Sequence, residues 1–225
     1  MYHGGARKPL MTDLTLYIGN KNYSSWSLRP WFAMRASGIH FHEELVPFDM
    51  AAGNPAFSAF SPTNKVPVLK HGQFNLWESL AIIEYLNELF PKKGLWPSDR
   101  RARAHARAIS CEMLSGFFGL RAQCPMNMRR VPSSINLSVE TRRDIKRIEQ
   151  IWKNCLERYG GPFLFGDLCA ADAMFAPVVN RFEVYCLSGN PAVKSYMQAM
   201  QSHPAWQEWE RAGRAEKWVV EEDEV

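Results

Sequence analysis

The strand patterns of this chain stop at residue 91, and nearly everything after residue 100 has helical periodicity. The segment between them, "PKKGLWPSDR" at residues 91–100, is rich in proline, glycine and lysine, a composition typical of a linker. We therefore predict an α/β domain at residues 12–92, followed by an all-α domain at residues 100–218. Residues 1–11 carry no periodic pattern and end at a second methionine, so we interpret them as a tag or an alternative start.

The first half predicts the element order β, α, β, α, β, β, α. "LTLYI" and "FHEELVPF" flank a helical segment, and their spacing fits a βαβ unit. "VPVLK" and "QFNL", on either side of a His71-Gly72 turn, predict an antiparallel hairpin, and an amphipathic helix follows at residues 79–90. In the second half we expect helices at about 100–128, 138–159, 171–187, 191–201 and 204–213.

Composition narrows the classes of function. With 46% hydrophobic residues and a formal charge of +4, the chain has the composition of a compact globular protein and no strong signal for nucleic-acid binding. No run approaches the roughly 18 apolar residues of a membrane span, and a signal peptide is absent, so we expect a cytoplasmic protein without membrane binding. Five cysteines without a CxxC pair indicate neither a disulfide framework nor a metal site.

The segment "NKNYSSWSLRPW", at residues 20–31, places Ser24, Ser25 and Ser27 at the start of the first predicted helix. These serines have two interpretations. A serine oxygen accepts a hydrogen bond from a free backbone N–H at a helix start, so Ser25 or Ser27 would be a cap. Alternatively, a hydroxyl at the positively polarised helix N-terminus stabilises an anion such as a thiolate. By itself the segment favours capping.

Two later segments have the same ambiguity. Val66-Pro67 opens a predicted strand, where proline is often purely structural. If that peptide bond is cis, the backbone of Val66 is free to pair with an extended peptide ligand. Glu78-Ser79 begins a helix, where the pair is either a cap beside a solvated charge or a site for a carboxylate and an α-ammonium group. The functional interpretations agree on a ligand that resembles an amino acid or a peptide.

A fourth segment, "GDLCAADAMFAP", places Asp172 three residues after Cys169 at the start of a buried helix. We interpret these two residues as a structural N-terminal cap. Because a thiol is a weaker acceptor than the hydroxyl usual at such a position, we expect this cap to be less stabilising than usual.

With these residues in place, the chain resembles the cytosolic glutathione transferases over residues 12–218. "SSWSLR" is similar to the SSCSxR motif of the zeta class, to which maleylacetoacetate isomerase belongs, and "VPVL", "ESLAIIEYL" and "AAD" follow in the family's order and spacing. The resemblance implies a thioredoxin-like N-terminal domain that binds glutathione, an all-helical C-terminal domain that supplies the electrophile pocket, and a homodimer.

The resemblance also implies roles for single residues. Ser24 matches the zeta catalytic serine, whose hydroxyl bonds to the glutathione sulfur, and Ser25 would be a supporting donor. Contacts to the rest of glutathione would come from five residues: Lys65 at the glycyl carboxylate, Val66 beside cis-Pro67 at the cysteinyl unit, and Glu78 with Ser79 at the γ-glutamyl end. The zeta motif has a cysteine where this chain has Trp26, which argues against a cysteine-based thiol transferase.

For the electrophile pocket we expect Met113, Phe117 and Arg121 to supply an apolar lining with an anion anchor, although the same side chains would pack a helical core equally well. The arginine that zeta isomerases carry in the later helix has no clear match, because Arg181 is near but out of register.

We predict a glutathione transferase that conjugates or isomerises small electrophiles, with glutathione as co-substrate and no metal. Its most concrete form is the cis-trans isomerisation of maleylacetoacetate. The alternative is a non-catalytic module of the same fold that binds ligands or proteins.

Overall fold

The structure is a computed structural model, and it describes residues 13–225. The tag or alternative start predicted at residues 1–11 lies outside the described residues. Four strands form one mixed sheet in the order β2-β1-β3-β4. They are β1 (Leu14–Ile18), β2 (His42–Leu45), β3 (Val68–His71) and β4 (Phe74–Trp77). Strand β1 pairs parallel with β2 and antiparallel with β3, and β3 pairs antiparallel with β4, so the predicted βαβ unit and hairpin are confirmed.

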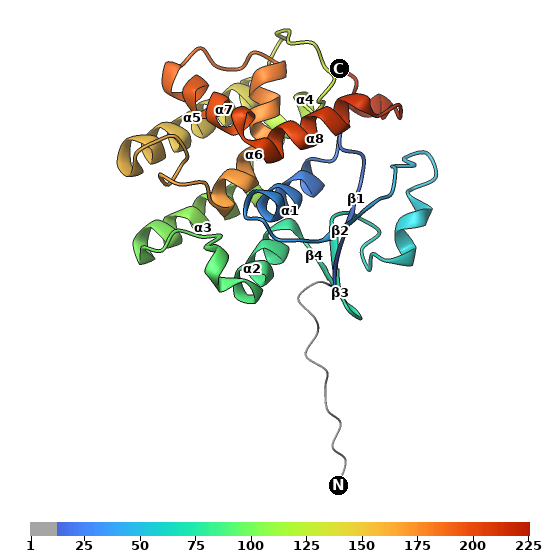
Figure 1. Cartoon of the computed structure of the whole chain (residues 1–225). Coiled ribbons are helices and arrows are strands. Elements are labelled where there is room, and N and C mark those ends of the chain that lie inside the picture. The colour runs from blue at the N-terminus through green and yellow to red at the C-terminus, as the bar shows by residue number, and fades with distance from the viewer. Residues whose placement is uncertain (1–12) are drawn as a thin grey trace.

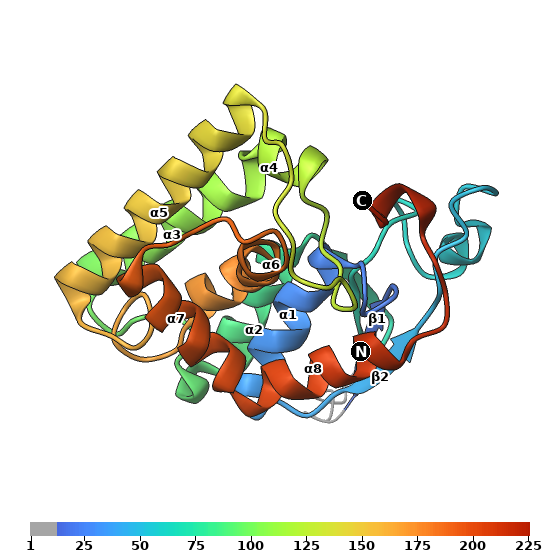
Figure 2. The same ribbon diagram turned by 90° about the horizontal axis from the view of Figure 1, so that it is seen from above.

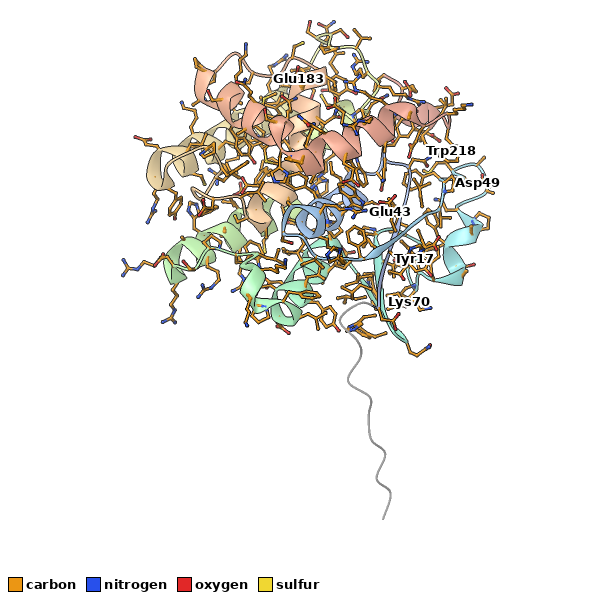
Figure 3. The ribbon with its side chains drawn as sticks, viewed as in Figure 1. Tyr17, Glu43, Asp49, Lys70, Glu183 and Trp218 are labelled. Atoms are coloured by element: carbon orange, nitrogen blue, oxygen red, sulfur yellow. The ribbon has the colours of Figure 1, made fainter. Side chains whose placement is uncertain are left out.

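The two faces of the sheet bury different side chains because residues alternate along a strand. Leu14, Leu16 and Ile18 face the main core with helices α1 (Ser25–Ala36) and α2 (Ser79–Leu89). Tyr17 points to the other face, where its ring stacks on Phe60 with 4.3 Å between ring centroids (Figure 3). A short 3₁₀ helix, η1 (Pro55–Ala59), covers that face. The helix that the sequence predicted between the second and third strands is therefore present as this 3₁₀ turn.

After the turn η2 (Pro91–Lys93) the chain is helical (Figure 1). The helices are α3 (Arg100–Ser115), α4 (Phe118–Gln123), α5 (Val139–Tyr159), α6 (Ala170–Val184), α7 (Pro191–Ser202) and α8 (Pro204–Ala215), followed by the 3₁₀ turn η3 (Glu221–Asp223). The single helix predicted at about 100–128 is wrong. It divides at Phe117, whose φ of 61° lies in the left-handed region and cannot continue an α-helix.

Helix α6 lies at the centre of the molecule, in contact with both α1 and α3 (Figure 1). Apart from Glu183, its residues are all buried. The Nε of Arg29 in α1 donates to the carbonyl of Met174 in α6 at 3.1 Å, which ties the sheet-bearing half to the helical half. Within residues 13–225, no helix is both long and apolar enough to cross a membrane. The same residues contain no group of three or more His, Cys, Asp or Glu side chains arranged to hold a metal ion.

Candidate functional site

A polar groove of about 160 Å³ lies between the start of β3 and the start of α2. Its lining comes from three segments of the chain: Trp26, then Thr63 with Lys65, Val66 and Pro67, and finally Trp77 with Glu78 and Ser79. The sequence analysis predicted five of these residues as a ligand-binding group: Lys65, Val66, Pro67, Glu78 and Ser79. The fold brings all five to one groove.

The Val66-Pro67 peptide bond is cis. Within residues 13–225, the backbone N–H and C=O of Val66 form no hydrogen bond. The residue before it is fixed in place, because the hydroxyl of Ser61 donates to the Lys65 carbonyl at 2.6 Å and accepts from the Lys65 N–H at 3.0 Å. The Lys65 side chain itself is exposed. The groove therefore offers the free backbone of Val66 beside the exposed ammonium group of Lys65.

At the other end of the groove, the start of α2 offers free backbone donors. Glu78 is the N-cap residue with a positive φ of 70°, and its side chain makes no capping hydrogen bond. In the described part of the chain, the N–H groups of Ser79 and Leu80 have no acceptor, as expected for a helix start without a cap. These N–H groups can bind an anion such as a carboxylate.

The hydroxyl of Ser79 is not available in the way the sequence indicated. It donates to the carbonyl of Trp26 in α1 at 2.9 Å. In an α-helix that carbonyl accepts from the N–H four residues later, but residue 30 is a proline and has no N–H. Ser79 therefore supplies the donor that Pro30 lacks, and this contact joins the starts of α1 and α2.

The three serines of α1 do not cap their helix, so the capping interpretation is wrong. Ser24 is the N-cap residue, but its hydroxyl donates to the Ser27 hydroxyl at 2.7 Å instead of accepting from the helix backbone. The Ser27 oxygen also accepts from the Gly19 N–H at 3.2 Å, which fixes the helix start to the end of β1. The hydroxyl of Ser25 has no partner among residues 13–225, and both Ser24 and Ser25 line the next cavity.

Because no side chain caps α1, its first turn keeps free donors. The N–H groups of Trp26 and Ser27 have no acceptor in the described residues, and the first helical bond starts at the Leu28 N–H. The start of α1 is therefore a second position that favours an anion.

A large cleft of about 390 Å³ begins at these serines and shares Trp26, Lys65 and Val66 with the polar groove. Its lining is mixed. The apolar part comes from both halves of the molecule: Phe48, Met50, Phe57, Pro125, Met126 and Val220. The charged part includes Arg121 and Arg181 from the helical half, with Glu222 and Asp223 from the end of the chain. A polar groove thus adjoins a partly apolar cleft that a pair of hydroxyls lines.

Comparison with known proteins agrees with this arrangement. A sequence model of the glutathione S-transferase N-terminal domain matches residues 23–89. Maleylacetoacetate isomerase from Rattus norvegicus is 29% identical over 212 residues, with 85% of this chain and 89% of that protein covered. A glutathione transferase homologue from Burkholderia, solved with bound glutathione, shares 26% identity with a TM-score of 0.69, covering 90% of this chain and 99% of that chain. This chain is therefore similar to glutathione transferases, in its N-terminal domain by sequence model and over most of its length by fold.

The predicted glutathione transferase architecture, a thioredoxin-like α/β domain with an all-helical domain after it, is confirmed. Glutathione S-transferase omega-2 from Mus musculus is also similar, with 25% identity over 194 residues that cover 84% of this chain and 75% of that protein. None of the five cysteines of this chain, all within the described residues, lines the groove or the cleft.

Two residues predicted for the electrophile pocket lie elsewhere. Met113 and Phe117 belong to the buried core, with 1% and 7% exposure, and neither lines the cleft. Arg121 does line the cleft, and its guanidinium lies 5.0 Å from the centroid of the Trp26 ring.

The cleft also contains residues that the sequence did not reveal. Arg181 lines it, although its register in the sequence had argued against a role. The sequence did contain a signal for Arg181. This residue lies on a helix that is buried nearly throughout, and charged residues are rarely buried unless they are paired or have a function. Glu222 and Asp223 gave no such signal, since their place depends on how the end of the chain folds back.

The predicted cap at the start of α6 is present. The Asp172 carboxylate accepts from the Cys169 N–H at 2.9 Å and from the Leu164 N–H at 3.1 Å. Burial raises the pKa of Asp172 to about 6, although these N–H donors oppose the rise. Burial also raises the pKa of the Cys169 thiol, so this cysteine stays protonated at neutral pH. Cys169 and Asp172 lie outside the groove and the cleft.

Proposed function

We propose that this protein is a glutathione transferase that activates the thiol of bound glutathione at the start of α1 and presents it to a small electrophile in the large cleft. One observation carries the proposal: the polar groove has free backbone groups that suit a peptide and a carboxylate, and it adjoins the cleft that Ser24 and Ser25 line. Glutathione has the complementary groups: a carboxylate at each end of a short peptide and a thiol on its middle residue.

In this proposal each group of the groove has one partner on glutathione. The free backbone of Val66, beside cis-Pro67, pairs with the cysteinyl unit. The N–H of Ser79 binds the γ-glutamyl carboxylate and Glu78 binds the α-ammonium group, while the Lys65 ammonium reaches the glycyl carboxylate. The Ser79 hydroxyl contributes through its bond to Trp26, which fixes the distance between the two helix starts.

The thiol then lies at the uncapped start of α1. An unperturbed thiol has a pKa of about 8.5, and each unit by which the pKa falls corresponds to about 1.4 kcal/mol of thiolate stabilisation. Free N–H groups at Trp26 and Ser27 supply part of this stabilisation, and a serine hydroxyl supplies a direct donor. The Ser24 hydroxyl already donates its hydrogen bond to the Ser27 oxygen. We therefore propose Ser25 as the donor to sulfur and Ser24 as the residue that positions the loop.

The electrophile is the less specified part of the proposal. The similarity to rat maleylacetoacetate isomerase supports a zeta-like isomerisation of maleylacetoacetate as one concrete reaction, and conjugation of other small electrophiles uses the same thiolate. The homodimer and the cytoplasmic location predicted from the sequence belong to this proposal, with the similarity to glutathione transferases as their support.

The test combines binding and turnover. Titration calorimetry measures glutathione affinity, and turnover is measured with 1-chloro-2,4-dinitrobenzene and with maleylacetoacetate, for the wild type, Ser25→Ala, Ser24→Ala and the exposed control Ser115→Ala. We expect Ser25→Ala to bind glutathione normally but to lose about 10²-fold in turnover, the usual effect of removing one donor to a developing anion. The pH at which turnover is half-maximal should rise in the same variant, because less thiolate forms at a given pH.

The outcomes separate the alternatives. An absence of glutathione binding would refute the proposal as a whole. Glutathione binding without turnover of either electrophile would favour the non-catalytic ligand-binding module instead. A larger loss in Ser24→Ala than in Ser25→Ala would return the role of sulfur partner to Ser24, as the resemblance to the zeta motif implies.

A further inference from the structure

The loop between β1 and α1 leads directly to the serines proposed as sulfur partners. Hydrogen bonds from the N–H groups of Tyr23 and Ser24 to the carbonyl of Asn20, at 3.2 Å and 2.7 Å, close this loop into a turn. The peptide unit between Lys21 and Asn22 lies in the middle of the turn. A shift of that peptide unit therefore also moves Ser24, which follows it by two residues.

The C-terminal end of α8 holds the middle of this turn. Glu216 is the C-cap residue of α8, and its carboxylate accepts from the Lys21 N–H at 2.7 Å and from the Asn22 N–H at 3.1 Å. Hydrogen bonds to a carboxylate are roughly twice as strong as those between neutral groups. The loop beside the serines is thus bound to a charged acceptor from the far end of the chain.

A glycine one helical turn earlier lets α8 come this close. Gly213 is buried, and a Cβ atom there would lie 3.1 Å from the carbonyl carbon of Lys21 and 3.2 Å from the nitrogen of Asn22. Both distances are shorter than ordinary van der Waals contact. Figure 2 shows α8 alongside α1, with its C-terminal end near β1. Gly213 and Glu216 together form a seat for the Lys21–Asn22 peptide, which we call the α8 seat.

The α8 seat is itself fixed by a buried polar network. The Arg129 side chain donates to the Glu216 carbonyl at 2.7 Å, and the Arg129 N–H donates to the side-chain oxygen of Asn22 at 2.9 Å. The Asn22 side-chain N–H group donates to the Asn127 side chain at 3.0 Å, and both asparagines are almost fully buried. Buried networks with every partner present are rigid. The loop, the seat and the segment at residues 127–129 therefore form one fixed unit.

Glu216 lines neither the groove nor the cleft, whereas Ser24 and Ser25, which follow its partners in the chain, line the cleft. We propose that Glu216 is a positioning residue: with Gly213 it holds the Lys21–Asn22 peptide and so sets where the serine hydroxyls and the free N–H groups of α1 lie. The inference rests on the proposed function, because what it positions is the proposed sulfur site. A displacement of about 1 Å at a reacting group costs up to about 10²-fold in rate.

Four variants of the full chain test this role. Glu216→Ala removes both acceptor oxygens, and Glu216→Gln keeps one of them. Gly213→Ala keeps the carboxylate but pushes against the Lys21–Asn22 peptide. The control is Glu210→Ala, because the Glu210 carboxylate bonds to Arg214 within the same helix. For each protein we would measure kcat and KM for glutathione with 1-chloro-2,4-dinitrobenzene over a range of pH, together with urea unfolding.

We expect Glu216→Ala to lower kcat about tenfold and to raise the pH at half-maximal turnover, because the thiolate donors are displaced. KM for glutathione should be unchanged, since the proposed contacts at Val66 and Ser79 do not involve this loop. Glu216→Gln should lie between Glu216→Ala and the wild type. Gly213→Ala should change kcat in the same direction, although alanine is otherwise the better helix former. Glu210→Ala should behave as the wild type.

Hydrogen exchange measures the contact without any turnover. In Glu216→Ala the amides of Lys21 and Asn22 should exchange about tenfold faster, because each loses a hydrogen bond to a charged acceptor. In Glu210→Ala their exchange should match the wild type. Mass spectrometry of a peptide that spans residues 20–28 reports both amides.

The outcomes separate this inference from the proposed function. An active wild type with unchanged kcat and pH profile in Glu216→Ala overturns the positioning role and leaves the transferase proposal intact, and a loss of stability alone has the same meaning. If Glu216→Ala does not fold, Glu216→Gln and Gly213→Ala give the answer through the same measurements. A wild type that binds no glutathione refutes the transferase proposal and with it the catalytic role of Glu216. Faster exchange in Glu216→Ala would then show a contact that serves the fold only.

Discussion

The bond from the Ser79 hydroxyl to the Trp26 carbonyl predicts that two distant residues, Ser79 and Pro30, are coupled in stability. Ser79→Ala leaves this partly buried carbonyl without a donor, which costs about 2 kcal/mol of the free energy of unfolding. In a Pro30→Ala background, residue 30 has an N–H that reaches the carbonyl four residues before it. Removal of the Ser79 hydroxyl should then cost only about 0.5 kcal/mol, so the coupling is about 1.5 kcal/mol.

Urea unfolding of the wild type, both single variants and the double variant measures this coupling. The matched control is Ser110→Ala, because the Ser110 hydroxyl is also fully buried and donates to a helix carbonyl, that of Ala106, at 2.7 Å. That carbonyl already accepts the N–H of residue 110 in the uninterrupted helix α3, so Ser110→Ala and Pro30→Ala should be additive. An equal cost of Ser79→Ala in both backgrounds would show that Pro30 is not the reason for the Ser79 contact.

The capping contacts of α6 give two further predictions. Because the pKa of Asp172 is raised from 3.8 to about 6, the folded state binds more protons than the unfolded state between pH 4 and pH 6, and this carboxyl makes the free energy of unfolding fall as the pH rises through that window. Urea unfolding at several pH values should show a weaker fall in Asp172→Asn, and identical slopes would contradict the assignment. Cys169→Ser should raise the free energy of unfolding by about 0.5–1 kcal/mol by supplying a better cap acceptor. Cys155→Ser, which buries a hydroxyl in the core, should lower it, and equal effects of the two changes would exclude a capping origin.

Much of the candidate site was predictable because its residues follow local rules. Proline at a strand start, an acidic residue and a serine at a helix start, and hydroxyls after a strand are each readable in a short window of sequence. Their convergence followed from the predicted element order, since the start of α1, the start of β3 and the start of α2 lie at one edge of this fold.

The assignment of single hydroxyls was less predictable. For the serines of α1 the sequence by itself favoured capping, and for Ser79 it left a cap and a ligand-binding site open. Neither Ser24 nor Ser79 forms a capping bond, because each hydroxyl donates its one proton to an acceptor that is distant in sequence or on the next helical turn. Ser79 bonds to Trp26 across 53 positions, and Ser24 bonds to Ser27.

The sequence by itself determined the division into a strand-bearing half and a helical half, and it singled out Val66, Pro67, Glu78 and Ser79 among the groove residues, because periodicity and helix-start chemistry are local properties. Only the tertiary structure decided which side chains line the cleft. Met113 and Phe117 belong to the core instead of the cleft. Arg181 and Asp223 face the same cleft because α6 and the end of the chain meet there, and such proximity between distant segments is set by packing of the whole molecule.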